Sequence, residues 1–93
     1  MSNFNKRERQ LISSIITAET YIRGDWELEM HYVDSVDELE NGWYAWKYNE
    51  EHGEAVPIND EYREDPLITD EEVEKYNVDL DRVFRKFHCY VSG

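Results

Sequence analysis

Acidic and basic residues occupy different parts of this chain, and their separation limits the folds in which the chain can be stable. Twenty of the 22 carboxylates lie between Asp25 and Asp81 with only three basic residues, which gives this segment a formal charge of −17. Residues 1–23 have a net charge of +2, and residues 82–93 have a net charge of +3. Self-repulsion on this scale costs stability and is usually retained for solubility or because a cationic partner neutralises it. The sequence therefore favours a function based on electrostatic recognition over one based on bond-making chemistry.

Aromatic residues predict a folded core despite this charge. Three Trp, seven Tyr and three Phe are present among the 93 residues, and such side chains bury large areas. A chain of this length forms one domain and removes about 60–65% of its unfolded surface on folding. We therefore expect a single acidic domain over residues 1–93.

Cysteine usage and the start of the chain bear on its location. Cys89 is the single cysteine, so no intrachain disulfide is possible. The polar first residues lack the apolar run of a signal peptide, and no stretch is long and apolar enough to predict a membrane span. These features predict a cytoplasmic protein, located in the host cell if a phage encodes it.

Apolar residues at helical spacing predict a first helix over residues 5–23. Asn5 and Glu8 have the spacing of an N-terminal capping pair. Gly24 suits the left-handed position that often follows the end of a helix.

Two segments rich in aromatic residues predict a small antiparallel sheet. Residues 26–33 alternate as a half-buried strand with an acidic outer face. The side chains expected to face inward are Trp26, Leu28, Met30 and Tyr32, and those expected to face outward are Glu27, Glu29 and His31. Residues 43–48 contain four aromatics and predict the second strand, with a helix that extends from Ser35 as the alternative.

The connection between these strands has two interpretations. Ser35 and Glu38 form a capping box, which predicts a short helix closing at Gly42. The alternative is a hairpin turn at Asn41 and Gly42, which requires residues 35–40 to be a strand. Asp and Glu are poor strand formers, so we favour the helix.

Residues 49–66 have neither helical nor strand periodicity beyond a short patch at residues 55–58. They include seven carboxylates, and long loops in small domains are often functional or mobile. We expect an exposed acidic loop that Tyr62 anchors.

Capping signals predict two helices in the last third of the chain. Thr69 and Glu72 form a capping box for a short helix that ends at residues 77–78, and Asp79 caps a final helix. The final helix is expected to turn Leu80, Val83, Phe84 and Phe87 inward. The predicted fold is a small α+β domain with an N-terminal helix, a small antiparallel sheet and a C-terminal helical hairpin.

Two groups of cations have either a structural role or a role in binding a partner, and the sequence leaves both interpretations open. They are Lys6, Arg7 and Arg9 in the first helix and Arg82, Arg85 and Lys86 in the last. The first group lies near a helix N-terminus, where the macrodipole disfavours each cation by about 0.3–1 kcal/mol. Docking against the acidic middle of the chain or contact with an anionic partner compensates for this cost.

Motifs of enzymes and metal sites are missing. The chain has no phosphate-binding Gly-rich loop, no nucleophile elbow and no zinc-protease or EF-hand spacing. His88 and Cys89 are adjacent, so on a helix their side chains point about 100° apart and do not meet. A metal site built from His31, His52, His88 and Cys89 lacks ligand-like spacing. We predict a non-enzymatic protein with no catalytic, cofactor or metal site.

The acidic surface suggests what kind of partner the protein has. B-DNA presents about one negative charge per 1.7 Å of axis, so a small folded polyanion can occupy a cationic nucleic-acid site. In composition alone the chain resembles small acidic phage-encoded inhibitors of restriction and CRISPR enzymes. We expect an inhibitor that mimics DNA or RNA and binds a basic nuclease or effector complex, with no direct nucleic-acid binding by the acidic face and no membrane partner. The alternatives are an immunity or antitoxin protein that neutralises a cationic nuclease toxin, and an accessory subunit that docks through its acidic face.

The residues predicted to contact the partner fall in the acidic middle of the chain. Trp46 or Tyr48 is the expected apolar anchor, because Trp and Tyr are enriched among interface hot spots. The full set is Glu27, Glu29, Asp37, Glu38, Glu40, Trp46, Tyr48, Glu50, Glu51, Glu54, Asp60, Glu61, Tyr62, Glu64 and Asp65.

Overall fold

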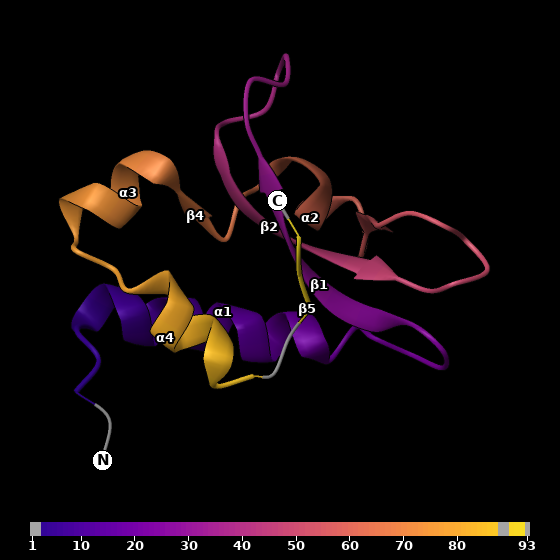
Figure 1. The fold of residues 1–93 in the computed structure, drawn as a ribbon, viewed down its shortest axis with the longest axis horizontal. Coiled ribbons are helices and arrows are strands. Elements are labelled where there is room, and N and C mark those ends of the chain that lie inside the picture. The colour runs from indigo at the N-terminus through magenta and orange to yellow at the C-terminus, as the bar shows by residue number, and fades with distance from the viewer. Residues whose placement is uncertain (1–2, 88–89, 93) are drawn as a thin grey trace.

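A hairpin of two seven-residue strands, β1 (Glu27–Val33) and β2 (Gly42–Tyr48), lies at the centre of the protein (Figure 1). The structure, a computed structural model, describes residues 3–87 and 90–92. The strands are antiparallel, with Glu27 opposite Tyr48. Both strands predicted from the sequence are therefore confirmed, each to within one residue at its start.

Three short strands extend the hairpin into a mixed sheet. The outer edge of β2 pairs antiparallel with β3 (Val56–Pro57) and with β4 (Ile68–Thr69). The other edge of β1 pairs parallel with β5 (Tyr90–Ser92), which the sequence had not indicated. The order β3-β2-β1-β5 makes β1 a central strand rather than an edge.

Helix α1 (Lys6–Glu19) begins with the predicted capping box. The backbone N–H of Glu8 donates to Asn5 Oδ1 over 2.9 Å, and the Asn5 N–H donates to Glu8 Oε1 over 2.8 Å. The helix ends at Glu19, four residues earlier than predicted. Gly24 has the expected positive φ of 61°, but it lies in the turn that leads to β1 instead of directly after the helix.

Two short helices, α3 (Asp70–Lys75) and α4 (Leu80–Arg85), follow the sheet. Thr69 and Glu72 form the predicted capping box of α3, and Asp79 Oδ1 accepts from the N–H of Arg82 at the start of α4. The predicted α+β fold, with an N-terminal helix, an antiparallel sheet and short C-terminal helices, is thus confirmed. Among the described residues, no helix is long and apolar enough to cross a membrane.

The core lies between α1, α4 and one face of the hairpin (Figure 1). Its side chains come from every part of the chain, as the periodicity of α1 and the inward face of β1 predicted. The fully buried members of this core are Leu11, Ile15, Ala18, Met30, Ala45, Ile68 and Val83, and Tyr44 is fully buried as well.

The segment between the two hairpin strands contains no helix, and no hairpin turn forms at Asn41 and Gly42, since Gly42 already belongs to β2. Ser35 and Glu38 have φ angles of 61° and 73°, which a right-handed helix cannot include. The Ser35 N–H donates to Asn41 Oδ1 over 2.9 Å, so the loop over residues 34–41 closes on itself. Both interpretations of this segment are therefore wrong. The pairing of β1 with β2 fixes where the loop must begin and end, and this overrides the local capping signal.

The expectation that residues 49–66 lack regular structure also needs correction. They contain β3 and a one-turn helix, α2 (Glu61–Glu64). The short patch at residues 55–58 supplies β3, because its backbone finds an open edge of β2. Ile58 is buried in the core. The expectation that the side chains of His88 and Cys89 do not meet concerns residues outside the described part of the chain.

Candidate functional site

Six carboxylates gather at the end of the hairpin where β1 begins and β2 ends. Two neighbouring hollows of about 360 and 390 Å³ open there, and Glu27 and Tyr48 line both of them. We call this group the strand-end acidic site. It consists of Asp25, Glu27, Glu29, Glu50, Glu51 and Glu54 around Tyr48.

The pairing of the strands explains why these residues meet. The register places Glu27 opposite Tyr48, so the two side chains are neighbours on one face of the sheet. The chain then leaves β2 and returns to pair Val56 with Lys47, which brings the loop over residues 49–55 back beside the start of β1. Figure 1 shows this loop projecting from the end of β2.

Asn49 organises the loop that supplies three of the carboxylates. Its side-chain oxygen accepts from the His52 N–H over 2.7 Å, and its carbonyl oxygen accepts from the Gly53 N–H over 3.2 Å. Gly53 has a φ of 80°, a conformation that favours glycine. Glu50, Glu51 and Glu54 are exposed on this turn and point their charges to solvent or to a partner.

Lys47, the basic residue near the end of β2, points toward an aromatic ring. Lys47 Nζ lies 4.6 Å from the centre of the Trp26 ring. Lys47 pairs with Leu28, on the face of the sheet opposite to Glu27 and Tyr48. Its charge is therefore held by a cation–π contact, and it forms no ion pair within 4.0 Å among the described residues.

The prediction that Glu29 lies on an exposed acidic face of β1 is wrong, because Glu29 is buried with only 4% of its surface exposed. Its Oε1 lies 3.1 Å from His31 Nδ1, and the His31 ring stacks on Trp46 with centres 4.4 Å apart. The cause is β5, which pairs along β1 and encloses Glu29 between two neighbouring strands. Glu29 lines one hollow but presents little surface to a partner.

Trp46 and Tyr48, the two expected anchors, have different surroundings. The Trp46 indole N–H donates to the Tyr62 carbonyl over 3.3 Å, and its ring is stacked on His31, so it is held within the fold. Tyr48 is partly exposed and lines both hollows. Of the two, Tyr48 is the aromatic that the site itself contains.

The structure divides the other predicted contact residues into two further groups. Asp37, Glu38 and Glu40 lie exposed in the loop at the opposite end of the hairpin. Seven residues at about 3.3 Å each separate that end from the strand-end acidic site by about 20 Å. The third group lies on and around α2 and comprises Asp60, Glu61, Tyr62, Glu64 and Asp65.

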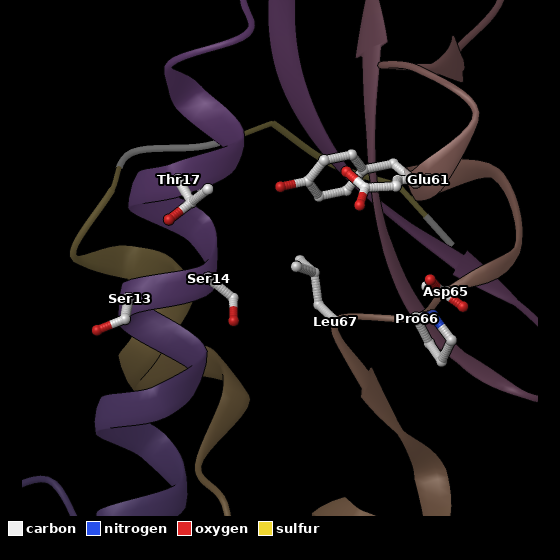
Figure 2. Close-up of a pocket in the computed structure, with 8 residues that line it drawn as sticks. Ser13, Ser14, Thr17, Glu61, Asp65, Pro66 and Leu67 are labelled. Atoms are coloured by element: carbon white, nitrogen blue, oxygen red, sulfur yellow. The ribbon is translucent and has the colours of Figure 1, made fainter.

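The α2 group borders a cleft of about 360 Å³ between α1 and residues 61–67 (Figure 2). In Figure 2 the Ser14 hydroxyl lies on the side of α1 that faces the cleft, the Ser13 hydroxyl points away, and Leu67 extends between the two walls. The Tyr62 ring packs edge-on against Tyr21 with centres 5.8 Å apart, and burial raises the pKa of the Tyr62 phenol. Tyr62 thus anchors α2 to the end of α1.

Sequence analysis missed Asp25, which lines the first hollow. It directly precedes Trp26, the first residue of the predicted strand, so its place at the strand end was a usable signal. Sequence analysis also missed the Tyr32 phenol, which donates to Asp70 Oδ2 over 2.6 Å and joins β1 to α3. The hydrogen bond to Asp70 raises the pKa of Tyr32 to about 12.

In the part of the chain that the structure describes, no three His, Cys, Asp or Glu side chains are arranged to hold a metal ion. Comparison with protein-family models, with curated proteins and with solved structures finds no match to this chain. The geometry and the charge of the strand-end acidic site are therefore the basis on which a function can be proposed.

Proposed function

We propose that the protein is a non-enzymatic inhibitor that binds the basic surface of a nucleic-acid-handling protein in place of DNA or RNA. The observation that carries this proposal is the concave strand-end acidic site, where six carboxylates surround Tyr48. Lysine and arginine side chains that normally contact phosphates match such a surface in charge. Tyr48 supplies an aromatic contact at its centre, as interface hot spots commonly do.

The hairpin loop supports mimicry of a nucleic acid in particular. Asp37, Glu38 and Glu40 lie about 20 Å from the strand-end acidic site along the hairpin. At about 3.4 Å per base pair, this separation corresponds to about six base pairs. Two acidic groups at this distance suit a long cationic groove better than a single small cationic pocket.

An immunity protein for a cationic nuclease toxin is the second candidate. The compactness of the strand-end acidic site favours it, because carboxylates packed around one tyrosine form a complete patch without the hairpin loop. The two candidates differ in whether the distant loop contributes to binding.

Two variants with equal loss of charge separate the candidates. The strand-end variant carries Glu50→Gln, Glu51→Gln and Glu54→Gln, and the loop variant carries Asp37→Asn, Glu38→Gln and Glu40→Gln. The native chain is immobilised, and a partner is captured from the native host at low salt. Its affinity for each variant is then measured with duplex DNA as competitor. A mimic requires that both variants bind more weakly, by about tenfold or more if each neutralised contact contributes about 0.5 kcal/mol.

The outcomes are distinct. Loss of affinity in the strand-end variant alone, with the loop variant unchanged, supports the immunity protein. Competition by DNA and a steep loss of affinity with salt are expected for the mimic. A captured partner without a basic groove, whose binding ignores both salt and DNA, would end the mimic proposal and favour an accessory subunit.

A further inference from the structure

Five exposed cations gather where the start of α1 lies against α4, and we call this group the basic end. Lys6 and Arg9 are three residues apart, and Arg85 and Lys86 follow Arg82 by three and four residues, so the cations of each helix lie within about one turn. The starts of the two helices are joined by the Asp79 N–H, which donates to Glu8 Oε2 over 2.8 Å. The five are Lys6 and Arg9 near the start of α1, Arg82 and Arg85 in α4, and Lys86 at the end of α4.

None of these five cations forms an ion pair within the described residues. This is unexpected in a chain with 22 acidic and 10 basic residues, where carboxylates are abundant. Arg7 shows the contrast. Its guanidinium donates to the Leu67 carbonyl over 3.0 Å and lies 3.4 Å from Glu72 Oε2. Arg7 therefore has a structural role, whereas the basic end leaves its charge available to a partner.

Phe4 orders two of the five cations. Arg9 Nη1 donates to the Phe4 carbonyl over 2.6 Å, and the Arg82 guanidinium carbon lies 4.3 Å from the centre of the Phe4 ring. Each guanidinium has five N–H donors, so most of them remain available. A guanidinium that is already positioned loses less side-chain entropy when it binds a phosphate.

An exposed aromatic ring lies beside the basic end. Asn5, which precedes Lys6, donates from its side chain to the Tyr76 carbonyl over 3.1 Å. Tyr76 is 44% exposed, and Lys75 Nζ lies 5.4 Å from the centre of its ring. Cations next to an exposed aromatic ring are the combination with which proteins bind single-stranded nucleic acids, since bases stack on the ring.

Repulsion from the rest of the protein does not prevent the approach of an anion. Asp79 and Asp81 are the exposed carboxylates at the start of α4, and the buried Glu8 lies between the starts of α1 and α4, so five cations less these three leave a local charge of +2. In Figure 1 the start of α1 and the loop after β2 lie toward opposite ends of the longest axis, which measures 38 Å. The Debye length is about 10 Å at 0.1 M salt, so the strand-end acidic site is largely screened at the basic end.

We propose that the basic end binds the phosphate backbone of single-stranded nucleic acid. The five cations contact successive phosphates, and Tyr76 stacks with a base. This binding is independent of the protein contacts proposed for the strand-end acidic site. On a partner that carries nucleic acid, the two ends of the molecule can act together.

Fluorescence anisotropy of a labelled single strand of about twelve nucleotides tests this proposal. The full chain is titrated at several salt concentrations. Five phosphate contacts predict a slope of about −3.5 in log affinity against log salt, since each contributes about −0.7. The variant with Arg85→Gln and Lys86→Gln, two side chains with no described contact to lose, should bind at least about tenfold more weakly with a slope of about −2.

A matched control removes two other exposed cations, Arg23→Gln and Arg63→Gln, with the same change in net charge. It should keep the affinity and the slope of the native chain. Tyr76→Ser should weaken binding to the single strand by about fivefold or more, because a stacked base contributes about 1–3 kcal/mol.

Three results would overturn the proposal. The first is an anisotropy that stays unchanged at low salt. The second is an equal loss of affinity in the control, which would show that only net charge matters. The third is self-association of the chain at low salt that Arg85→Gln with Lys86→Gln abolishes while no oligonucleotide binds. That result would assign the basic end to a second copy of the chain.

Discussion

At the scale of single residues, two buried carboxylates show how this acidic chain satisfies its charges. Glu8 and Glu29 are each 4% exposed. Glu8 accepts from the N–H groups of Asn5 and Asp79, both over 2.8 Å, and so connects the caps of α1 and α4. Glu29 pairs with His31. Burying a carboxylate without a partner is costly. Glu8 therefore depends on Asp79, which is far away in the sequence, and Glu29 depends on His31 in the same strand.

Glu72, which is partly exposed, shows how hydrogen bonds offset the cost of burying a carboxylate. Burial tends to raise the pKa of Glu72, but the Thr69 N–H and the Arg7 guanidinium outweigh this and lower it. This contribution to stability is present above the usual value of 4.5 and is lost as the pH falls through the lowered pKa. Arg7 thereby connects the basic start of the chain to its acidic middle.

A residue-scale prediction concerns the hydrogen bond from Tyr32 to Asp70. The pKa of Tyr32 is raised from 10.0 to about 12, so the bond stabilises the fold fully below pH 10 and loses its effect as the pH rises through 12. Tyr32→Phe should therefore lower the free energy of unfolding at neutral pH. In this variant the free energy of unfolding should also fall less steeply between pH 10 and about pH 12. Urea titrations at a series of pH values measure both effects, with Tyr76→Phe at an exposed ring as the control. An unchanged decline in Tyr32→Phe would contradict the role of this bond.

At the scale of elements, the contact between β2 and β4 explains the glycine at the start of β2. A Cβ added to Gly42 would lie 2.4 Å from the Ile68 carbonyl oxygen and 2.8 Å from Thr69 Cα, both backbone atoms. Neighbouring hydrogen bonds fix this approach, since the Asp70 N–H donates to the Asn41 carbonyl over 3.0 Å. Glycine is therefore required here by close packing of two chain segments, and its φ angle plays no part.

The prediction at this scale is that Gly42→Ala destabilises the protein by about 1–3 kcal/mol, as overpacking of a fitted contact typically does. Amide exchange should quicken at Leu67 and Asp70, whose N–H groups bond to β2 and to the residue before it. Gly53→Ala is the control, because a Cβ there meets no atom within 4 Å. It should cost only the strain of its positive φ, about 1 kcal/mol. Equal effects on exchange of the Leu67 and Asp70 amides in both variants would refute the packing explanation.

At the scale of the whole molecule, charge is separated in space as well as in sequence. The basic end and the strand-end acidic site lie toward opposite ends of the longest axis (Figure 1). Arg7 with Glu72 is the Arg or Lys ion pair among the described residues, and His31 Nδ1 lies 3.1 Å from Glu29 Oε1. Most carboxylates of the acidic middle are therefore not neutralised within the protein, and this arrangement is what the two proposed surfaces have in common.

The prediction for the whole molecule follows from this lack of neutralisation. Added monovalent salt should raise the melting temperature, because a Debye length of about 10 Å at 0.1 M screens repulsion within the acidic middle. The variant with Glu50→Gln, Glu51→Gln and Glu54→Gln removes three exposed charges and should show a smaller rise. Calorimetry at low and moderate salt measures both. A melting temperature that is flat or falls with salt would mean that the basic ends already neutralise the middle.

Elements with local signals could be predicted correctly from the amino-acid sequence. Capping at Asn5, Thr69 and Asp79 and the periodicity of α1 and β1 depend on residues within a few positions of one another. Such signals survive in almost any tertiary arrangement, and they led to the correct α+β fold. The separation of acidic and basic residues could likewise be read directly from the sequence.

Long-range contacts determine which carboxylates lie close together. Pairing with β5 buries Glu29, the return of the chain through β3 brings Glu50, Glu51 and Glu54 to Glu27, and the hairpin register leaves the loop over residues 34–41 without a helix. In each case a long-range backbone contact overrides a local preference. Strand pairing joins residues far apart in sequence, and no short window contains the information about which edge meets which.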